Sequence, residues 1–167
     1  APPYFMLNEL SLENYRTFSK LSPPLRTEED RNNIINGILD GTIDVIVSDH
    51  TPHDQDAKRL PFNQAEFGGV GLETLLPMTL NLVKNNNLSL TKAISLITKN
   101  PSEILGLKTG KISPDLEADL IVFDLEKPWK INSESFHSKS KNSPFDGILV
   151  QGKNLMTFVR GRLVYKS

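Results

Sequence analysis

The chain has 167 residues, of which 38% are hydrophobic and 23% are charged, and its formal net charge is −1. This composition is typical of a globular protein and offers no basic surface for nucleic acid or an anionic membrane, so we expect neither as a partner. The chain has no cysteine, which excludes disulfides, thiolate metal sites and thiol nucleophiles and agrees with a cytoplasmic location. No apolar run approaches the roughly 20 residues of a membrane span, and the N-terminus has no signal-peptide pattern.

The first elements are read from turn and cap residues. Residues 15–21 predict a short strand, which ends where two prolines follow. Thr27 is the predicted N-cap of a helix, with Asp30 in the capping-box position and Gly41 at the C-terminal stop. Residues 43–48 then predict a strand buried on both faces, because β-branched apolar residues follow one another.

Two further helices follow a glycine-rich turn at residues 68–71. The first is predicted over residues 72–84, and Pro77 inside it should kink or restart the helix. Ser89 is the predicted N-cap of the next helix, and the pair Asn100-Pro101 should break it.

After residue 107 the pattern changes to β-structure. Residues 118–124 and 155–165 are strand-like, and Gly161 divides the second run as a hairpin or bulge. Residues 132–142 are polar and predict a loop. The part before residue 107 holds two strand–helix units with flanking helices, whereas a (β/α)8 barrel needs eight strands and typically about 250 residues. We therefore expect the C-terminal part of a larger protein, and a first residue other than Met agrees with this.

The most informative motif stands at the end of the 43–48 strand. Ser48, Asp49, His50 and His53 follow the apolar run directly. A carboxylate and two imidazoles at the C-terminal end of a parallel strand are typical of the active-site mouth of a barrel enzyme. The alternative for Asp49 is a strand-end aspartate that only caps the following turn.

With these motifs the chain resembles the C-terminal portion of the dihydroorotases, in the amidohydrolase superfamily. The resemblance extends over nearly the whole chain. It rests on Ser22-Pro-Pro-Leu-Arg26, Asp40-Gly-Thr-Ile-Asp44, Ser48-Asp-His-Thr-Pro-His53, Phe67-Gly-Gly-Val-Gly-Leu-Glu-Thr74, Asn100-Pro101, Gly110-Lys-Ile112, Ala118-Asp-Leu120 and Ser138-Lys-Ser-Lys-Asn-Ser-Pro-Phe145.

The resemblance implies an α/β fold: residues 1–107 would be the C-terminal part of a (β/α)8 TIM-type metal-dependent hydrolase barrel, and residues 108–167 a segment of a small β-sandwich domain. It also implies a zinc-dependent hydrolase that interconverts N-carbamoyl-L-aspartate and dihydroorotate in pyrimidine biosynthesis. One or two Zn²⁺ ions would lower the pKa of the attacking water.

Site residues follow from the same resemblance. Asp49 matches the family's catalytic aspartate, which touches the metal and carries a proton from the water to the leaving nitrogen. His53 matches the histidine that binds the substrate carboxylate. The backbone of Phe67 and Gly68 matches the segment that binds the pyrimidine ring, and Ser22 stands at a substrate-binding position.

Two positions depart from the family pattern. Family members usually carry Thr-Pro-His-His where this chain reads Ala1-Pro2-Pro3-Tyr4, so one metal-binding histidine is missing. Ser22 replaces an asparagine, and a hydroxyl keeps only part of the hydrogen bonding of an amide. The family's other metal ligands fall outside these 167 residues.

Several polar residues keep two interpretations. His50 is either an orienting or a catalytic histidine. Arg26 either binds an anion or pairs with an acid of the next helix. Lys58 and Arg59 are expected on a solvated loop near the site, and His137 is expected to be exposed and without a role.

Three functions remain open. The first is an active zinc dihydroorotase, with a small-molecule substrate and a homodimer or aspartate carbamoyltransferase as further partner. The second is an inactive dihydroorotase-like scaffold for aspartate carbamoyltransferase, which the missing histidine favours. The third is another cyclic amidase of the hydantoinase or allantoinase kind.

Overall fold

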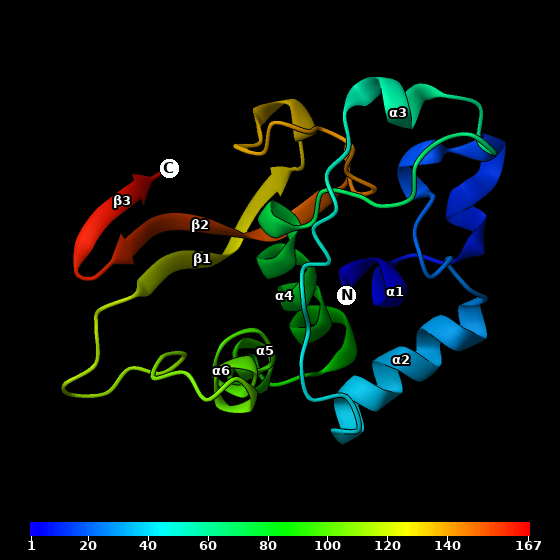
Figure 1. Cartoon of the computed structure of the whole chain (residues 1–167). Coiled ribbons are helices and arrows are strands. Elements are labelled where there is room, and N and C mark those ends of the chain that lie inside the picture. The colour runs from blue at the N-terminus through cyan, green and yellow to red at the C-terminus, as the bar shows by residue number, and fades with distance from the viewer.

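The computed structural model describes residues 1–167 and contains six α-helices and one three-stranded sheet (Figure 1). The helices are α1 (Pro2–Met6), α2 (Glu28–Asp40), α3 (Gln55–Arg59), α4 (Leu75–Asn86), α5 (Leu90–Ile97) and α6 (Lys99–Ile104). The strands are β1 (Leu120–Lys130), β2 (Leu149–Val159) and β3 (Arg162–Lys166). Short 3₁₀-helices cover Glu9–Tyr15, Thr17–Ser19, Leu72–Thr74 and Ser133–Ser135. None of the helices has the length and apolar character that crossing a membrane requires.

The predicted helix starts are confirmed. Thr27 and Asp30 form the reciprocal capping box of α2, and Gly41 ends that helix in the left-handed conformation with φ 91°. Ser89 caps α5 because its hydroxyl accepts a hydrogen bond from the backbone N–H of Lys92, three residues further on. Pro77 lies in the first turn of α4, so the chain restarts its helix there, as one of the two predicted outcomes.

The predicted strand 43–48 is wrong for these residues. The segment runs without a strand partner between α2 and α3 (Figure 1). The nearest strand-like pairing is a single parallel bridge from His50, just after the segment, to Gly69. The side chain of Val47 is 55% exposed, so burial on both faces is also absent. A strand requires a hydrogen-bonded neighbour, and no strand of the chain lies beside this segment.

Two other boundaries differ from the predictions. Residues 15–21 do not form a strand, because 3₁₀-helical turns occupy Glu9–Tyr15 and Thr17–Ser19. The break after α5 falls at Thr98, not at Asn100-Pro101. Pro101 lies in the first turn of α6, where the missing N–H has no intrahelical acceptor and so costs nothing.

The sheet is antiparallel with the order β1-β2-β3. A tight turn at Arg160 (φ 50°) and Gly161 (φ 73°) joins β2 to β3, which confirms the predicted hairpin. The sheet is longer than predicted, because β1 continues past residue 124 after an irregular register between Asp124 and Pro128.

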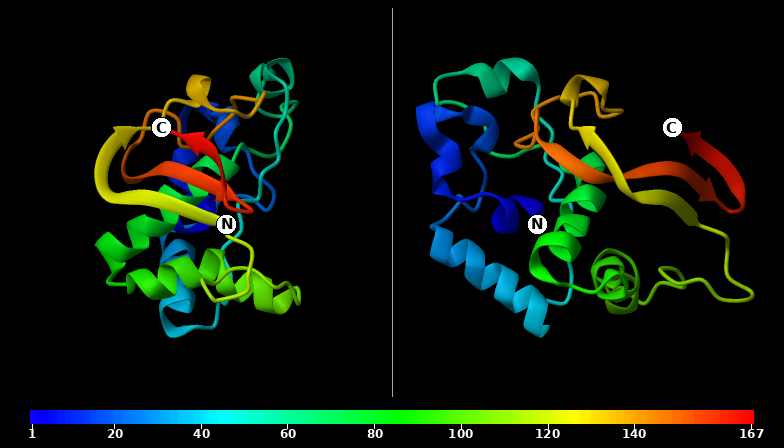
Figure 2. Two further views of the ribbon diagram at one scale, coloured as in Figure 1. Left: turned by 90° about the vertical axis from the view of Figure 1, so that its left-hand side faces the viewer. Right: turned by 180° about the vertical axis from the view of Figure 1, so that it is seen from behind.

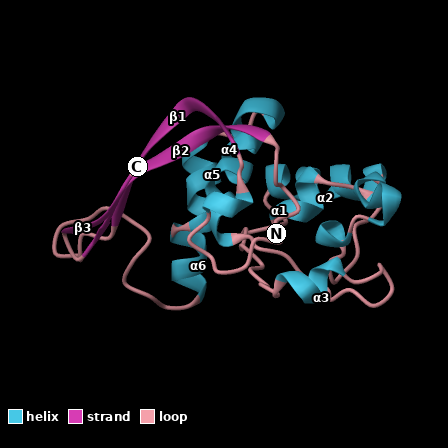
Figure 3. Ribbon diagram, turned by 90° about the horizontal axis from the view of Figure 1, so that it is seen from above, coloured by secondary structure: helices cyan, strands magenta, loops and turns pink.

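The core joins both halves of the chain. α4 contacts α1, α5 and β2, and the sheet projects from the side of α4 opposite to α1 and α2 (Figures 2 and 3). Fourteen buried apolar residues form one cluster. Met78 and Leu82 of α4 belong to it together with Ile131, Phe145 and Val150 from beyond residue 107. The predicted domain boundary after residue 107 stays a prediction.

Candidate functional site

The glycine-rich turn packs directly against the segment that carries Asp49. A Cβ at Gly71 would lie within 3.0 Å of the Ser48 carbonyl oxygen, and Gly68 adopts a φ of 121° against Thr51. The N–H of Thr51 donates to the carbonyl of Gly69 at 2.9 Å. Glycine is therefore required at position 71 by the close approach of the Ser48 backbone, and at position 68 by the backbone conformation.

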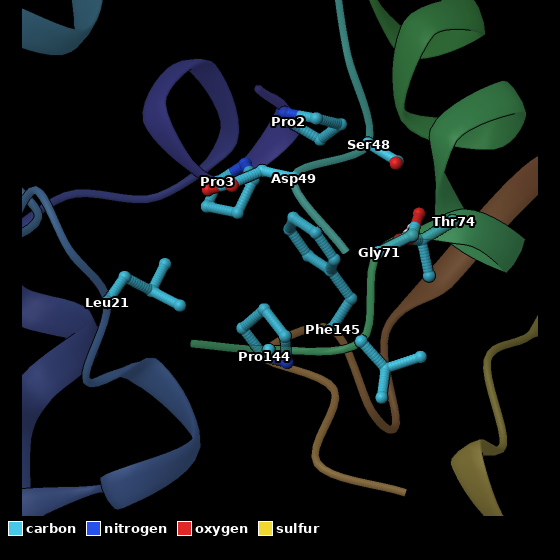
Figure 4. A pocket seen from close by; sticks show the side chains of 11 residues that line it. Pro2, Pro3, Leu21, Ser48, Asp49, Gly71, Thr74, Pro144 and Phe145 are labelled. Carbon is cyan, nitrogen blue, oxygen red and sulfur yellow. Dashed lines mark hydrogen bonds between the residues drawn. The ribbon is translucent and has the colours of Figure 1, made fainter. Parts of the chain in front are cut away.

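A small cleft opens where these two segments meet α1 and the 142–145 segment (Figure 4). The cleft is small: its cavity volume is about 10 Å³, about the space of one water molecule. The lining residues come from five separate parts of the chain: Pro2, Pro3, Leu21, Ser48, Asp49, Gly69, Val70, Gly71, Thr74, Pro144 and Phe145. Asp49 is the only ionisable side chain among them, so any charge chemistry in the cleft depends on it.

Asp49 is exposed and makes no hydrogen bond through its carboxylate. Its backbone is left-handed, with φ 48°, a conformation that Asp and Asn adopt more readily than other non-glycine residues. Nearby, burial and then the charge of Asp49 raise the pKa of Tyr4 to about 12. The Tyr4 hydroxyl donates to the carbonyl of Pro23 at 2.9 Å. The Tyr4 hydroxyl is therefore protonated and hydrogen-bonded within the protein in this structure.

The two histidines that follow Asp49 have different surroundings. His50 Nδ1 accepts hydrogen bonds from the N–H groups of Gly71 at 3.2 Å and Leu72 at 3.4 Å, which favours the orienting interpretation. His53 Nε2 is buried and has no hydrogen-bond partner in the protein. An unpartnered buried nitrogen is costly unless a ligand or water completes it.

The predicted ring-binding segment is only partly free. The Gly68 N–H donates to the carbonyl of Lys20 at 3.0 Å, and its own carbonyl accepts from Lys58 Nζ at 2.9 Å and Asn142 Nδ2 at 3.3 Å. Phe67 makes no hydrogen bond through its N–H or carbonyl, and its side chain is 51% exposed. Ser22 is exposed and its hydroxyl is unbonded. Phe67, not Gly68, therefore has backbone groups without a protein partner, and neither residue lines the cleft beside Asp49.

Lys58 corrects the expectation of a solvated loop. It lies on α3 and is completely buried, with Nζ donating to the carbonyls of Lys20 at 3.3 Å, Glu66 at 2.7 Å and Gly68 at 2.9 Å. Burial, followed by the charge of Lys20, lowers the pKa of Lys58 to about 8, and Glu66 acts in the opposite direction. Arg59 is exposed, as expected.

Sequence reasoning also missed two residues that join distant motifs. Asn142, which is 1% exposed, accepts from the His53 N–H through Oδ1 at 3.4 Å and donates to the Gly68 carbonyl. The Glu73 carboxylate accepts from the N–H groups of His137 and Ser138, both at 3.1 Å. In the sequence, the only indication of their importance is that both lie within motifs that resemble those of the dihydroorotases, Phe67–Thr74 and Ser138–Phe145. The two contacts fix the 137–142 segment beside the cleft.

The structure bears on the expectations for Arg26 and His137. Arg26 forms an ion pair with Asp30 of α2, with Nε 3.5 Å from Oδ2, so it has a structural partner. His137 is exposed, as expected, and its ring lies edge-on to Tyr165.

The residues of this chain do not make a metal site by themselves. No group of three or more histidine, aspartate, glutamate or cysteine side chains is close enough to hold an ion. Asp49 supplies one free carboxylate, while His50 directs Nδ1 to backbone N–H groups. A tetrahedral zinc site needs at least three protein ligands, so the residues present do not fit a complete one.

Comparisons with known proteins give the family. The model of the amidohydrolase family matches residues 10–164. Dihydroorotases from Anaplasma phagocytophilum, Ehrlichia chaffeensis and Ruminiclostridium cellulolyticum are 50%, 44% and 45% identical to the whole chain. The chain spans 37–39% of the length of these relatives.

Solved structures give the same placement. The L-hydantoinase from Arthrobacter aurescens superposes with a TM-score of 0.91 at 32% identity, covering 99% of this chain and 38% of the other. Dihydropyrimidinase from Brevibacillus agri superposes with a TM-score of 0.90 at 23% identity, covering 99% of this chain and 38% of the other, and shares the fold. The 167 residues form a fragment of this fold that ends in a small antiparallel sheet, and the chain belongs to the amidohydrolase family.

Proposed function

We propose that the chain is part of a dihydroorotase, which interconverts N-carbamoyl-L-aspartate and dihydroorotate and so acts in pyrimidine biosynthesis. The observation that carries the proposal is identity to a dihydroorotase of 50% over the whole chain, against 32% for the L-hydantoinase. The free carboxylate of Asp49 at a cleft wall supports it. A cytoplasmic location and a homodimer or aspartate carbamoyltransferase partner stay predictions.

The fold proposal extends beyond the residues described. Residues 1–107 would complete a (β/α)8 barrel with further polypeptide, and 43–48 would become one of its strands. The half-exposed Val47 and the absent ladder support this, since an apolar unpaired segment gains hydrogen bonds from neighbouring strands. The sheet β1–β3 would join further strands in a β-sandwich.

The chemistry assigned to this chain is proton transfer and substrate binding. Asp49 would take a proton from the attacking water and give it to the leaving ring nitrogen. His53 would bind the substrate carboxylate through the buried Nε2, and the free backbone groups of Phe67 would contact the ring. Ser22 would add one hydroxyl contact. A zinc ion would need ligands from outside this chain, and no step is assigned to it.

Replacement of Asp49 by asparagine tests the role of the carboxylate. Asparagine keeps the shape and tolerates the left-handed backbone, so only the charge and basicity are lost. In the full-length gene product we expect dihydroorotate hydrolysis to fall by about 10²-fold or more, the usual contribution of a positioned acid–base group. Asp44→Asn is the matched control, because Asp44 is an exposed aspartate of the same segment outside the cleft.

The outcomes separate the three functions. Undiminished hydrolysis by the Asp49→Asn protein would remove Asp49 from the mechanism. Wild-type turnover of hydantoin without turnover of dihydroorotate would establish the cyclic amidase alternative. Turnover of neither substrate, with binding to aspartate carbamoyltransferase, would establish the scaffold.

A further inference from the structure

Lys58 is unusual because its ammonium is buried without forming an ion pair. The residue is 0% exposed, and no carboxylate pairs with it or with the neighbouring buried Lys20. Its three N–H donors meet three backbone carbonyls instead. Since the pKa of Lys58 is about 8, the group is mainly the three-donor ammonium at neutral pH.

The carbonyls that Lys58 binds stand on either side of Phe67. Nζ is 2.7 Å from the Glu66 oxygen and 2.9 Å from the Gly68 oxygen. With both flanking carbonyls directed inward to the same ammonium, the backbone of Phe67 is fixed in direction. Its own N–H and carbonyl remain free and its ring half exposed.

Lys20 binds the carbonyls of the residues that precede Glu66 in the same loop. Its Nζ lies 2.7 Å from the carbonyl oxygen of Phe62 and 2.6 Å from that of Ala65, with Asn63 at 3.3 Å. The same ammonium lies 4.4 Å from the centre of the Phe67 ring, within cation–π range. Two ammonium groups therefore hold five carbonyls of residues 62–68.

Apolar packing contributes little to this segment beyond the contact of the half-buried Phe62 ring with Tyr15. Between Phe62 and Gly68 only Ala65 belongs to the buried apolar residues, and it lies outside the main hydrophobic cluster. Removing the ammonium of Lys58 would leave the Glu66 carbonyl without a donor, which costs about 1–3 kcal/mol for a buried group. The carbonyls of Lys20 and Gly68 would each keep one hydrogen bond, from the Gly68 N–H and from Asn142 Nδ2. The direction of the carbonyls in this segment thus depends on the N–H donors of Lys58 and Lys20 more than on burial of apolar side chains.

We propose that Lys58, supported by Lys20, is a positioning residue that presents the backbone of Phe67 to the substrate ring. The proposal rests on the proposed function for the identity of the ligand, but the ordering of residues 62–68 does not depend on it. Lys58 touches no ligand in this scheme and acts only through the direction of the Phe67 peptide groups.

The test compares Lys58→Met with Lys92→Met in the full-length gene product. Lys92 also donates to a backbone carbonyl, that of Leu39 at 2.8 Å, but lies on α5 away from the cleft. For Lys58→Met we expect the KM for dihydroorotate to rise about tenfold or more with kcat within about threefold, because binding is lost and not chemistry. Competitive inhibition by orotate, whose ring is not hydrolysed, should weaken by the same factor.

Amide hydrogen exchange gives a measurement that needs no activity. Peptides covering residues 61–69 should exchange about tenfold faster or more in Lys58→Met and at the wild-type rate in Lys92→Met. If Lys58→Met does not fold, Lys20→Met is the second variant and should show the same two changes. Wild-type KM and unchanged exchange in a folded variant would overturn the proposal. A wild-type protein inactive on dihydroorotate would instead refute the proposed function, and exchange would still decide the role of Lys58.

Discussion

Replacing Gly71 by alanine should separate the glycine-rich turn from the segment that carries Asp49. The new Cβ would lie under 3.0 Å from the Ser48 carbonyl oxygen and 3.1 Å from its carbon, and both atoms belong to the backbone. Backbone cannot rotate aside as a flexible side chain can, so one of the two segments must move.

The cost follows from two contacts. Overpacking of this kind costs about 1–3 kcal/mol. The shift also lengthens the 3.2 Å hydrogen bond from the Gly71 N–H to His50 Nδ1, which is worth about 1 kcal/mol. We therefore expect the free energy of unfolding to fall by about 2–4 kcal/mol, since the two losses come from the same movement.

The assay is guanidinium unfolding of the full-length gene product, together with dihydroorotate hydrolysis. A misplacement of about 1 Å at a catalytic segment can lower kcat/KM by about 10²-fold, and we expect a loss of that order. Gly37→Ala is the matched control, because Gly37 lies within α2, where alanine favours the helix. The new Cβ would meet side-chain atoms and no backbone, the nearest being Ile43 Cδ1 at 3.2 Å and Cγ1 at 3.3 Å. If both variants unfold at the same denaturant concentration with unchanged kcat/KM, the close approach of Gly71 to Ser48 has no consequence and the reasoning is refuted.

Two further predictions concern ionisable groups. The folded-state pKa of Lys58, about 8, lies below its ordinary 10.5, so the unfolded chain binds more protons between these values. The free energy of unfolding should therefore rise with pH between about 8 and 10.5, by at most about 1.4 kcal/mol per pH unit. Denaturation of the wild type and of Lys58→Met across this pH range measures the rise, and the variant should lack the contribution of Lys58. Glu73→Gln should lower the free energy of unfolding by about 1–2 kcal/mol, because it weakens two hydrogen bonds from backbone N–H groups to a carboxylate. The control Glu103→Gln affects only an exposed ion pair with Lys99 and should change the free energy of unfolding by less than about 0.5 kcal/mol. Equal losses in the two variants would contradict the prediction.

The features that could be predicted from sequence are those set by neighbouring residues. The capping box of Thr27 and Asp30, the cap at Ser89 and the hairpin at Gly161 involve partners within three residues. Helix caps and tight turns are determined by residues close in sequence, so the sequence pattern is enough to predict them.

The features that could not be predicted depend on partners far along the chain. The 43–48 segment has strand composition, but its ladder partner is a matter of tertiary structure, and none lies within these residues. Lys58 looks like an ordinary surface residue until the carbonyls of residues 20, 66 and 68 surround it. Asn142 contacts His53 across 89 positions of sequence, which no local pattern reveals.

The shared core has a consequence for how the chain melts. Met78 and Leu82 pack in one cluster with Ile131, Phe145 and Val150, so the residues before and after position 107 have no separate interior. Loss of either part exposes the buried surface of the other. Unfolding of the two parts is therefore cooperative, and a fragment cut at position 107 lacks a closed hydrophobic core.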